Sequence, residues 1–92
     1  MSRMTVELPS LLAMVNNGVD RLEIEASTLV DAFRVLRSEH PGVGDQVFDE
    51  SGSLRQHVLC FYNETNTRWL DDLAIPTVDG DVIRFYQAVS GG

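Results

Sequence analysis

The sequence predicts an α+β fold in which one main helix packs on one face of a mixed sheet of four or five strands. Two segments of alternating apolar and polar residues come first in the chain. A segment with the 3.6-residue apolar period of a helix follows them, and further apolar segments of strand length come after that helix. A hairpin, a helix and a second group of strands bury their apolar faces together when the helix lies across the sheet.

The first two predicted strands lie on either side of a long loop. Residues 4–8 and residues 21–25 each alternate between apolar and polar side chains, which is typical of a strand with one buried face. Pro9 ends the first strand, because proline has no backbone N–H to donate to a neighbour. The Asn-Asn-Gly run at residues 16–18 predicts a turn, so these strands are expected to pair as a hairpin with a long connection.

The main helix is expected to begin after Ser27 or Thr28. Either side chain can cap the first turn, and Asp31 stands three residues after Thr28, as in a capping box. The Pro-Gly pair at residues 41–42 is expected to end the helix, and residues 43–48 are expected to form a connector. The apolar stripe that would face the core is Leu29, Ala32, Phe33 and Leu36.

The second half of the chain predicts the remaining strands. Residues 58–62 are apolar on both faces, as in a strand at the middle of a sheet, and residues 67–70 are expected to form a short edge strand. Residues 71–76 predict an irregular or short helical crossing. A tight turn at residues 79–81 then leads into the last strand over residues 82–87. This order of elements, at this length, is that of the β-grasp or ubiquitin-like fold.

The outer face of the sheet is the expected docking surface for partner proteins. Alternation along the last strand turns Ile83 and Phe85 toward the helix, so the residues between and beside them point outward. In the middle strand the same rule turns Val58, Cys60 and Tyr62 inward. Contiguous exposed apolar side chains mark protein interfaces. The predicted docking patch is Leu59, Phe61, Arg84 and Tyr86.

Size, charge and cysteine content narrow the possible functions. We expect one domain over residues 1–88, followed by a flexible tail over residues 89–92. The net charge of -7 opposes binding to nucleic acid. The single cysteine, Cys60, cannot form an internal disulfide, which fits a reducing compartment. No segment reads as a signal peptide or as a membrane span, so a cytoplasmic location is expected.

The chain ends in Ser90, Gly91 and Gly92, soon after the last apolar strand. Glycine has no side chain, so two terminal glycines can lie extended in a channel too narrow for other residues. The group at the end is a carboxylate, which becomes a good electrophile only after activation, for example as an acyl-adenylate. The pattern suggests a protein whose own C-terminus reacts, although a glycine-rich end is also typical of a frayed terminus.

Other residues capable of chemistry give weaker patterns. Cys60 falls inside a strand, where cysteine is usually a small core residue. His40 and His57 lack metal-ligand spacing, and His40 is expected to end the helix. The acidic turn at residues 79–81 lacks the rest of a calcium-binding loop. Trp69 is expected either to anchor a partner or to cover one edge of the core. The sequence therefore predicts no metal site and no catalytic residue.

Four motifs resemble the ThiS/MoaD family of small β-grasp sulfur carriers over nearly the whole chain. They are Thr28 and Leu29 at the start of the helix, Tyr62, Asn63 and Glu64 at the end of the central strand, residues 79–82 before the last strand, and residues 88–92 at the end. The most specific feature is the number of residues that separates the Asp-Gly-Asp turn from the terminal Gly-Gly. Gln87 stands where the family commonly has proline, and Ser90 where alanine is common; neither change touches the diglycine. The long first loop and the Ala-Val-x-Gly-Gly ending are most similar to CysO-type carriers, which serve cysteine biosynthesis.

The resemblance implies a cycle in which Gly92 is the reacting residue. An E1-like adenylyltransferase and sulfurtransferase would bind the domain, take Gly91 and Gly92 into its ATP site and form an acyl-adenylate at Gly92. A sulfur donor would displace AMP, and the resulting thiocarboxylate would attack the acceptor in a sulfur-accepting synthase. A JAMM-type metalloprotease would act where the product must be hydrolysed from the carrier. The carrier itself would bind no cofactor and have no catalytic residue, since the partner enzyme uses the ATP.

Other functions stay open at this point. The acceptor pathway could equally be that of molybdopterin, thiamin, methionine or a sulfur-containing natural product. A ubiquitin-like modifier would be activated in the same way and joined through Gly92 to a lysine of a target protein. A β-grasp interaction subunit would carry an inert tail.

Overall fold

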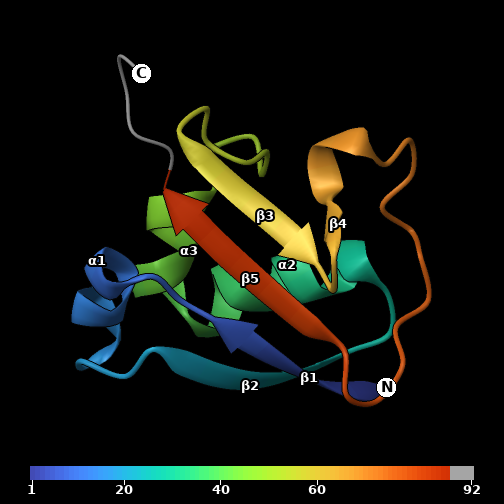
Figure 1. Ribbon diagram of the computed structural model, residues 1–92, viewed down its shortest axis with the longest axis horizontal. Helices are drawn as coiled ribbons and strands as arrows, with labels where there is room; N and C mark the ends of the chain where they lie inside the picture. The colour runs from blue at the N-terminus through green and yellow to red at the C-terminus, as the bar shows by residue number, and fades with distance from the viewer. Residues whose placement is uncertain (88–92) are drawn as a thin grey trace.

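The computed structural model describes residues 1–87, and within them it confirms an α+β fold with a mixed five-stranded sheet (Figure 1). In chain order the elements are β1 (Ser2–Glu7), α1 (Ser10–Ala13), the 3₁₀ helix η1 (Met14–Asn16), β2 (Arg21–Ala26), α2 (Leu29–Glu39), α3 (Pro41–Val47), β3 (Val58–Tyr62), β4 (Thr65–Asn66), the 3₁₀ helix η2 (Thr67–Trp69) and β5 (Val82–Gln87). The order of strands across the sheet is β2-β1-β5-β3-β4. The last strand in the sequence is therefore the central strand of the sheet.

The pairing of β5 makes the sheet mixed. β1 pairs antiparallel with β2, from Ser2 opposite Ala26 to Glu7 opposite Arg21, which confirms the predicted hairpin. β5 runs parallel to β1 and antiparallel to β3, so it is hydrogen-bonded on both sides. Figure 1 shows α2 and α3 together on one face of the sheet, behind β3 and β5. The described chain thus has one covered face and one face that no helix covers.

The core lies between the sheet and these two helices. All four residues of the predicted helix stripe are buried, and Val35 joins them. Three phenylalanine rings meet at the centre: Phe33 and Phe48 have centroids 5.0 Å apart, and Phe48 and Phe85 have centroids 6.2 Å apart. The second pair meets edge to face, at 89°, and the first is tilted at 50°; aromatic pairs at such distances stabilise a core beyond the area that they bury. Ile83 and Phe85 point into this core, as predicted from alternation.

The start of α2 follows the predicted capping pattern with one difference. The Thr28 side chain accepts a hydrogen bond from the Asp31 backbone N–H at 3.1 Å. The Asp31 carboxylate accepts one from the backbone N–H of Ser27, also at 3.1 Å, rather than from Thr28. Two of the otherwise unpaired amides at the helix start are therefore satisfied, which typically stabilises a helix by about 1 kcal/mol.

The expectation that residues 43–48 form a connector is wrong. Those residues lie largely within α3, which follows α2 after a single intervening residue, His40. The proline ends α2 but also begins α3, since its fixed φ and missing N–H suit the first position of a helix. A Cβ added to Gly44 would lie 2.9 Å from the Cα of Arg37, so glycine lets the two helices touch through their backbones.

Two further elements differ from the prediction. The loop after β1 contains α1 and η1, whose four and three residues are too short to give a clear apolar period. The edge strand is β4, Thr65–Asn66. Residues 67–70, where the edge strand was expected, instead form η2 and the residue that caps its C-terminal end. Asn66 ends the strand because its side chain accepts a hydrogen bond from the Arg68 backbone N–H at 3.0 Å and so caps η2.

Candidate functional site

The predicted reactive tail begins where β5 ends. Ser90, Gly91 and Gly92 lie outside the described residues, which stop at Gln87. Gln87 pairs with Val58 of β3, Ile83 and Arg84 pair with both β1 and β3, and β5 beyond Arg84 pairs with β3 alone. The residues after Gln87 therefore continue from a strand that is held in the sheet, through β3, up to its last residue.

The four residues of the predicted docking patch lie together on the face of the sheet that no helix covers. Leu59 stands opposite Tyr86, and Phe61 stands opposite Arg84, in the antiparallel pairing of β3 with β5. The rings of Phe61 and Tyr86 have centroids 5.7 Å apart and meet nearly edge to face, at 84°. Tyr86 is 46% exposed, and both rings line a shallow hollow of about 310 Å³. This geometry forms a continuous apolar surface.

Arg84 carries the one charge within this patch, and its guanidinium group is held in place. Its Nε donates a hydrogen bond to the Glu7 carboxylate at 2.7 Å. The same carboxylate lies 3.7 Å from the guanidinium of Arg21, so Glu7 joins two arginines across β1 and β2. The positive charge of Arg84 is thereby partly neutralised, and its side chain is oriented along the sheet.

The other end of β5 is fixed by Asp81, which sequence reasoning treated only as a turn residue. Its carboxylate is buried and accepts hydrogen bonds from the Tyr62 hydroxyl, from the Val78 backbone N–H at 2.9 Å and from the Asn63 side chain at 3.3 Å. Burial alone would raise the pKa of Asp81, but these hydrogen bonds outweigh it and lower the pKa below its usual 3.8. Burial and the neighbouring carboxylate raise the pKa of Tyr62 to about 12. Asp81, Tyr62, Asn63 and the Val78 N–H therefore form a hydrogen-bonded cluster with a structural role, which we call the Asp81 clamp.

The tight turn that supplies Asp81 depends on its glycine. Gly80 has a φ of 92°, in the region that favours glycine, and donates its N–H to the Arg3 carbonyl at 3.0 Å. The carboxylate of Asp79 accepts a hydrogen bond from the Arg3 backbone N–H at 2.9 Å. The Asp-Gly-Asp motif thus fastens the start of β5 to β1 and β3.

The remaining chemical candidates have structural positions. Cys60 is fully buried, and burial raises the pKa of its thiol to about 12, so it stays protonated and unreactive. His40 is the last residue before α3 and ends α2, as predicted. Trp69 is 78% exposed, so it does not cover the edge of the core. Among residues 1–87, no group of His, Cys, Asp or Glu side chains is arranged to hold a metal ion.

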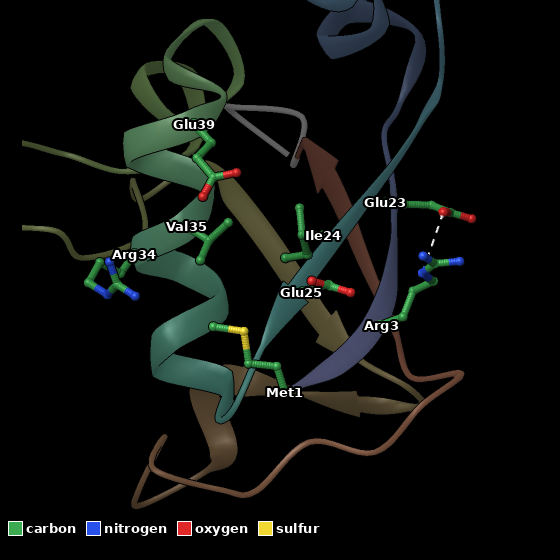
Figure 2. A pocket seen from close by; sticks show the side chains of 8 residues that line it. All are labelled: Met1, Arg3, Glu23, Ile24, Glu25, Arg34, Val35 and Glu39. Atoms are coloured by element: carbon green, nitrogen blue, oxygen red, sulfur yellow. Dashed lines mark ion pairs between the residues drawn. The ribbon is translucent and has the colours of Figure 1, made fainter.

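A hollow of about 370 Å³ lies between β2 and α2, and its lining does not have the arrangement of an active site (Figure 2). Its lining mixes arginines and glutamates, and Arg3 lies 4.0 Å from Glu23. Figure 2 shows Arg34 and Arg3 pointing away from each other, to either side of the hollow. Because the two guanidinium groups point in opposite directions, they cannot both contact one ligand in the hollow. Within the described part of the chain, no helix has the length and apolar character needed to cross a membrane.

Sequence reasoning also missed an exposed apolar group on α1 and η1, which includes Leu11 and Met14. A signal for it was present, because residues 8–19 contain no charged residue in a chain that is 23% charged. The run was interpreted only as a long loop. Helical period cannot be detected over so few residues, so only the folded structure shows which of these side chains point outward.

Comparison with known proteins identifies the family. Residues 11–92 match the sequence profile of the ThiS family. The chain is 28% identical to the sulfur carrier protein CysO of Mycobacterium tuberculosis over 90 residues, covering 96% of this chain and 97% of that one.

Two solved structures are also similar along nearly their whole length. The BexX/CysO complex of Amycolatopsis orientalis contains a chain with a TM-score of 0.79 and 25% identity, covering 97% of this chain and 99% of that one. SAMP1 of Haloferax volcanii has a TM-score of 0.76 and 28% identity, covering 99% and 100%. Carriers of this kind bind no cofactor and are activated by partner enzymes. The chain therefore belongs to the ThiS family and is a sulfur carrier protein of the ThiS/CysO type, a co-substrate of partner enzymes and not itself an enzyme.

Proposed function

We propose that Gly92 is the sulfur-bearing residue and that an E1-like enzyme activates it. The Gly92 carboxylate attacks the α-phosphate of ATP, pyrophosphate leaves, and a sulfur donor then displaces AMP to give a thiocarboxylate. AMP is a good leaving group where hydroxide is not. The observation that carries the proposal is the placement of β5, which is the central strand of the sheet and ends five residues before Gly92 beside an uncovered apolar face.

Leu59, Phe61, Arg84 and Tyr86 form the docking patch in this proposal. A patch of aromatic and aliphatic side chains with one oriented arginine has the composition enriched at protein interfaces. Tyr86 is the side chain of this patch closest to the tail. A partner that holds the patch also holds the strand from which residues 88–92 continue.

The favoured pathway is cysteine biosynthesis. Its support is the 28% identity to the mycobacterial CysO over nearly the whole chain. In this pathway a cysteine synthase would accept the sulfur, leaving the new cysteine bound to Gly92. A JAMM-type metalloprotease would then release it and restore the carboxylate.

Intact mass after incubation tests the activation step. The chain is incubated with ATP, a sulfide source and the E1-like enzyme from its own genome. Replacement of one terminal oxygen by sulfur is expected, and it should require both ATP and the enzyme. As a control, the same enzyme must release pyrophosphate from ATP when another ThiS-family carrier is supplied. If that control works and the mass of this chain stays unchanged, Gly92 is not the reacting residue. A total mass increase of one cysteine residue over the unmodified chain, on addition of a cysteine synthase and an activated serine, would support the pathway.

A protein modifier is the second candidate function. The observation that favours it is the 28% identity to SAMP1, a small archaeal modifier protein, over 99% of this chain. All seven basic residues of the present chain are arginines, and it contains no lysine. Any isopeptide bond from Gly92 to a lysine would therefore join this chain to another protein. Trypsin cleaves last after Arg84, so mass spectrometry of a tryptic digest for the eight residues 85–92 attached to lysines of a cell extract tests this alternative directly.

A further inference from the structure

A second apolar surface lies on α1, η1 and the turn that follows them. Its four side chains are unusually exposed for their type: Leu11 by 64%, Met14 by 73%, Val15 by 46% and Val19 by 51%. No charged residue occurs in residues 8–19. We call these four residues the α1 surface. On a chain with a net charge of -7, an uncharged apolar area of this kind marks an interaction surface.

The α1 surface is held rigidly. Leu12, between two of its members, is buried in the core. The Leu8 N–H donates to the Asp20 carbonyl at 2.8 Å and closes the base of the loop, while the Gly18 N–H donates to the Ala13 carbonyl at 2.8 Å. The backbone at Val15 packs closely on α3, since a Cβ added to Gly42 would lie 3.1 Å from the Val15 carbonyl. The exposed side chains are therefore presented on a fixed scaffold, which reduces the entropy lost on binding.

The α1 surface lies at the edge of the sheet where residues 88–92 begin. β1 and β5 run parallel with Glu7 opposite Arg84, so their C-terminal ends point the same way. α1 starts three residues after Glu7. Pro9, at the start of α1, lines one hollow of about 130 Å³ together with Phe85 and Tyr86. Figure 1 shows α1 on the same side of the molecule as the tip of β5.

Because only a few residues separate Gly92 from the end of β5, any enzyme that acts on Gly92 must bind close to this edge of the sheet. Five residues follow Gln87, and a fully extended chain of five residues spans at most about 18 Å. An interface that holds a domain typically buries about 800 Å² of each partner and involves 20 or more of its residues. The four-residue docking patch on the sheet is too small to meet that requirement alone, and the α1 surface, near the same end of β1 and β5, supplies further apolar side chains.

We propose that the α1 surface is a docking site for the enzyme that adenylates Gly92, at the rim of the channel that receives the tail. The inference rests on the proposed function. The adenylating enzyme is the occupant because it keeps the domain bound through two successive steps, and release of the acyl-adenylate between them would expose it to hydrolysis. Its complementary surface is apolar and uncharged, since charged groups are depleted at interface centres.

Two double variants test this surface. Leu11→Ser with Met14→Ser removes its two most exposed side chains. Val30→Ser with Val78→Ser is the matched control, since both valines are exposed, by 47% and 63%, and neither belongs to either surface beside the tail. All four side chains are exposed, so the thermal midpoints of both double variants should stay close to that of the unmodified chain.

Pyrophosphate release by the adenylating enzyme is measured at increasing carrier concentration, together with calorimetric binding of carrier to enzyme without ATP. For L11S/M14S, KM and Kd should both rise about tenfold or more while kcat changes less than twofold. The control variant should match the unmodified chain. Unchanged KM and Kd in L11S/M14S would overturn the inference, as would an equal rise in the control.

Two outcomes separate this inference from the proposed function. If the unmodified chain binds the enzyme but releases no pyrophosphate, the proposed reaction fails, and the binding data still test the α1 surface. If the variant is adenylated normally but loses sulfur transfer to the acceptor synthase, the α1 surface belongs to that second enzyme and the assignment made here is wrong.

Discussion

The two ends of β5 are built for different purposes. At its start, the Asp81 carboxylate accepts three hydrogen bonds, and the preceding turn is fastened to β1 through Arg3. At its other end, Tyr86 is exposed, and the nearby α1 surface offers apolar side chains to solvent. At the first end the polar groups make internal hydrogen bonds, while at the second end Tyr86 stays 46% exposed although its ring packs on Phe61. The difference indicates that stability is concentrated at one end and partner contact at the other.

This division suits a carrier whose reacting group lies beyond the fold. A strand fixed at its start and paired with β3 up to Gln87 places its far end at a defined position. In the proposed function, partner enzymes then recognise that position through the docking patch and the α1 surface. Four variants should separate the two roles, and they are described from the largest expected effect to the smallest.

Deletion of Gly92 should remove activity without touching either end of β5. The chain would lack the residue proposed to carry sulfur, so no thiocarboxylate should form, as measured by intact mass. The thermal midpoint should not change, because the buried apolar core of the described residues runs from Met4 to Phe85 and does not include Gly92. A marked fall in that midpoint would mean that the tail also supports the fold.

Asp81→Ala should weaken the pinned end of β5. The change leaves the Tyr62 hydroxyl, the Val78 N–H and the Asn63 amide without their acceptor, and loss of such a buried charged acceptor typically costs about 2–3 kcal/mol of unfolding free energy. Urea unfolding measures this loss. Asp79→Ala is the control, since it loses one exposed hydrogen bond and should cost less than about 1 kcal/mol. Equal losses in the two variants would contradict the clamp.

Tyr86→Ser should act mainly on binding at the other end. Tyr86 is half exposed and packs edge to face on Phe61, so its loss should raise KM for the adenylating enzyme about tenfold. Its effect on unfolding free energy should stay below about 1.5 kcal/mol, the range for one aromatic pair. A fall in stability as large as that of Asp81→Ala, with KM unchanged, would show that this end serves the fold instead.

Lowering the pH should reduce the difference in unfolding free energy between the unmodified chain and the Asp81→Asn variant. The pKa of Asp81 is lowered in the folded state, so its contribution to stability is fully present above the unfolded pKa near 4 and is lost as pH falls through the lower folded value. The difference in unfolding free energy between the two proteins should therefore shrink from pH 6 to pH 3. A difference that stays constant across this range would mean that Asp81 acts only through packing.

Much of the fold could be predicted because its signals are local. The bounds of β5 and β3, the cap at Thr28 and the buried stripe of α2 follow from period and capping, which depend on residues close together in the chain. α3 was missed because the Pro-Gly pair was interpreted only as an end of a helix, whereas proline also begins one. The edge strand was misplaced by two residues because strand boundaries there depend on the Asn66 cap.

The sequence by itself determined the order of strands and helix, the identity of the buried side chains and the diglycine that ends the chain. Each depends on side-chain type and spacing alone. Only the tertiary structure decided that Tyr62, Asn63 and Asp81 meet, and that α1 lies beside the tip of β5. The contacts of Asp81 with Asn63 and Tyr62 join residues 18 and 19 positions apart, and they arise from the pairing of β3 with β5, which are not neighbours in the sequence. The diglycine proposed to react is visible in the sequence, but the surfaces proposed to bind its partners are formed only by the fold.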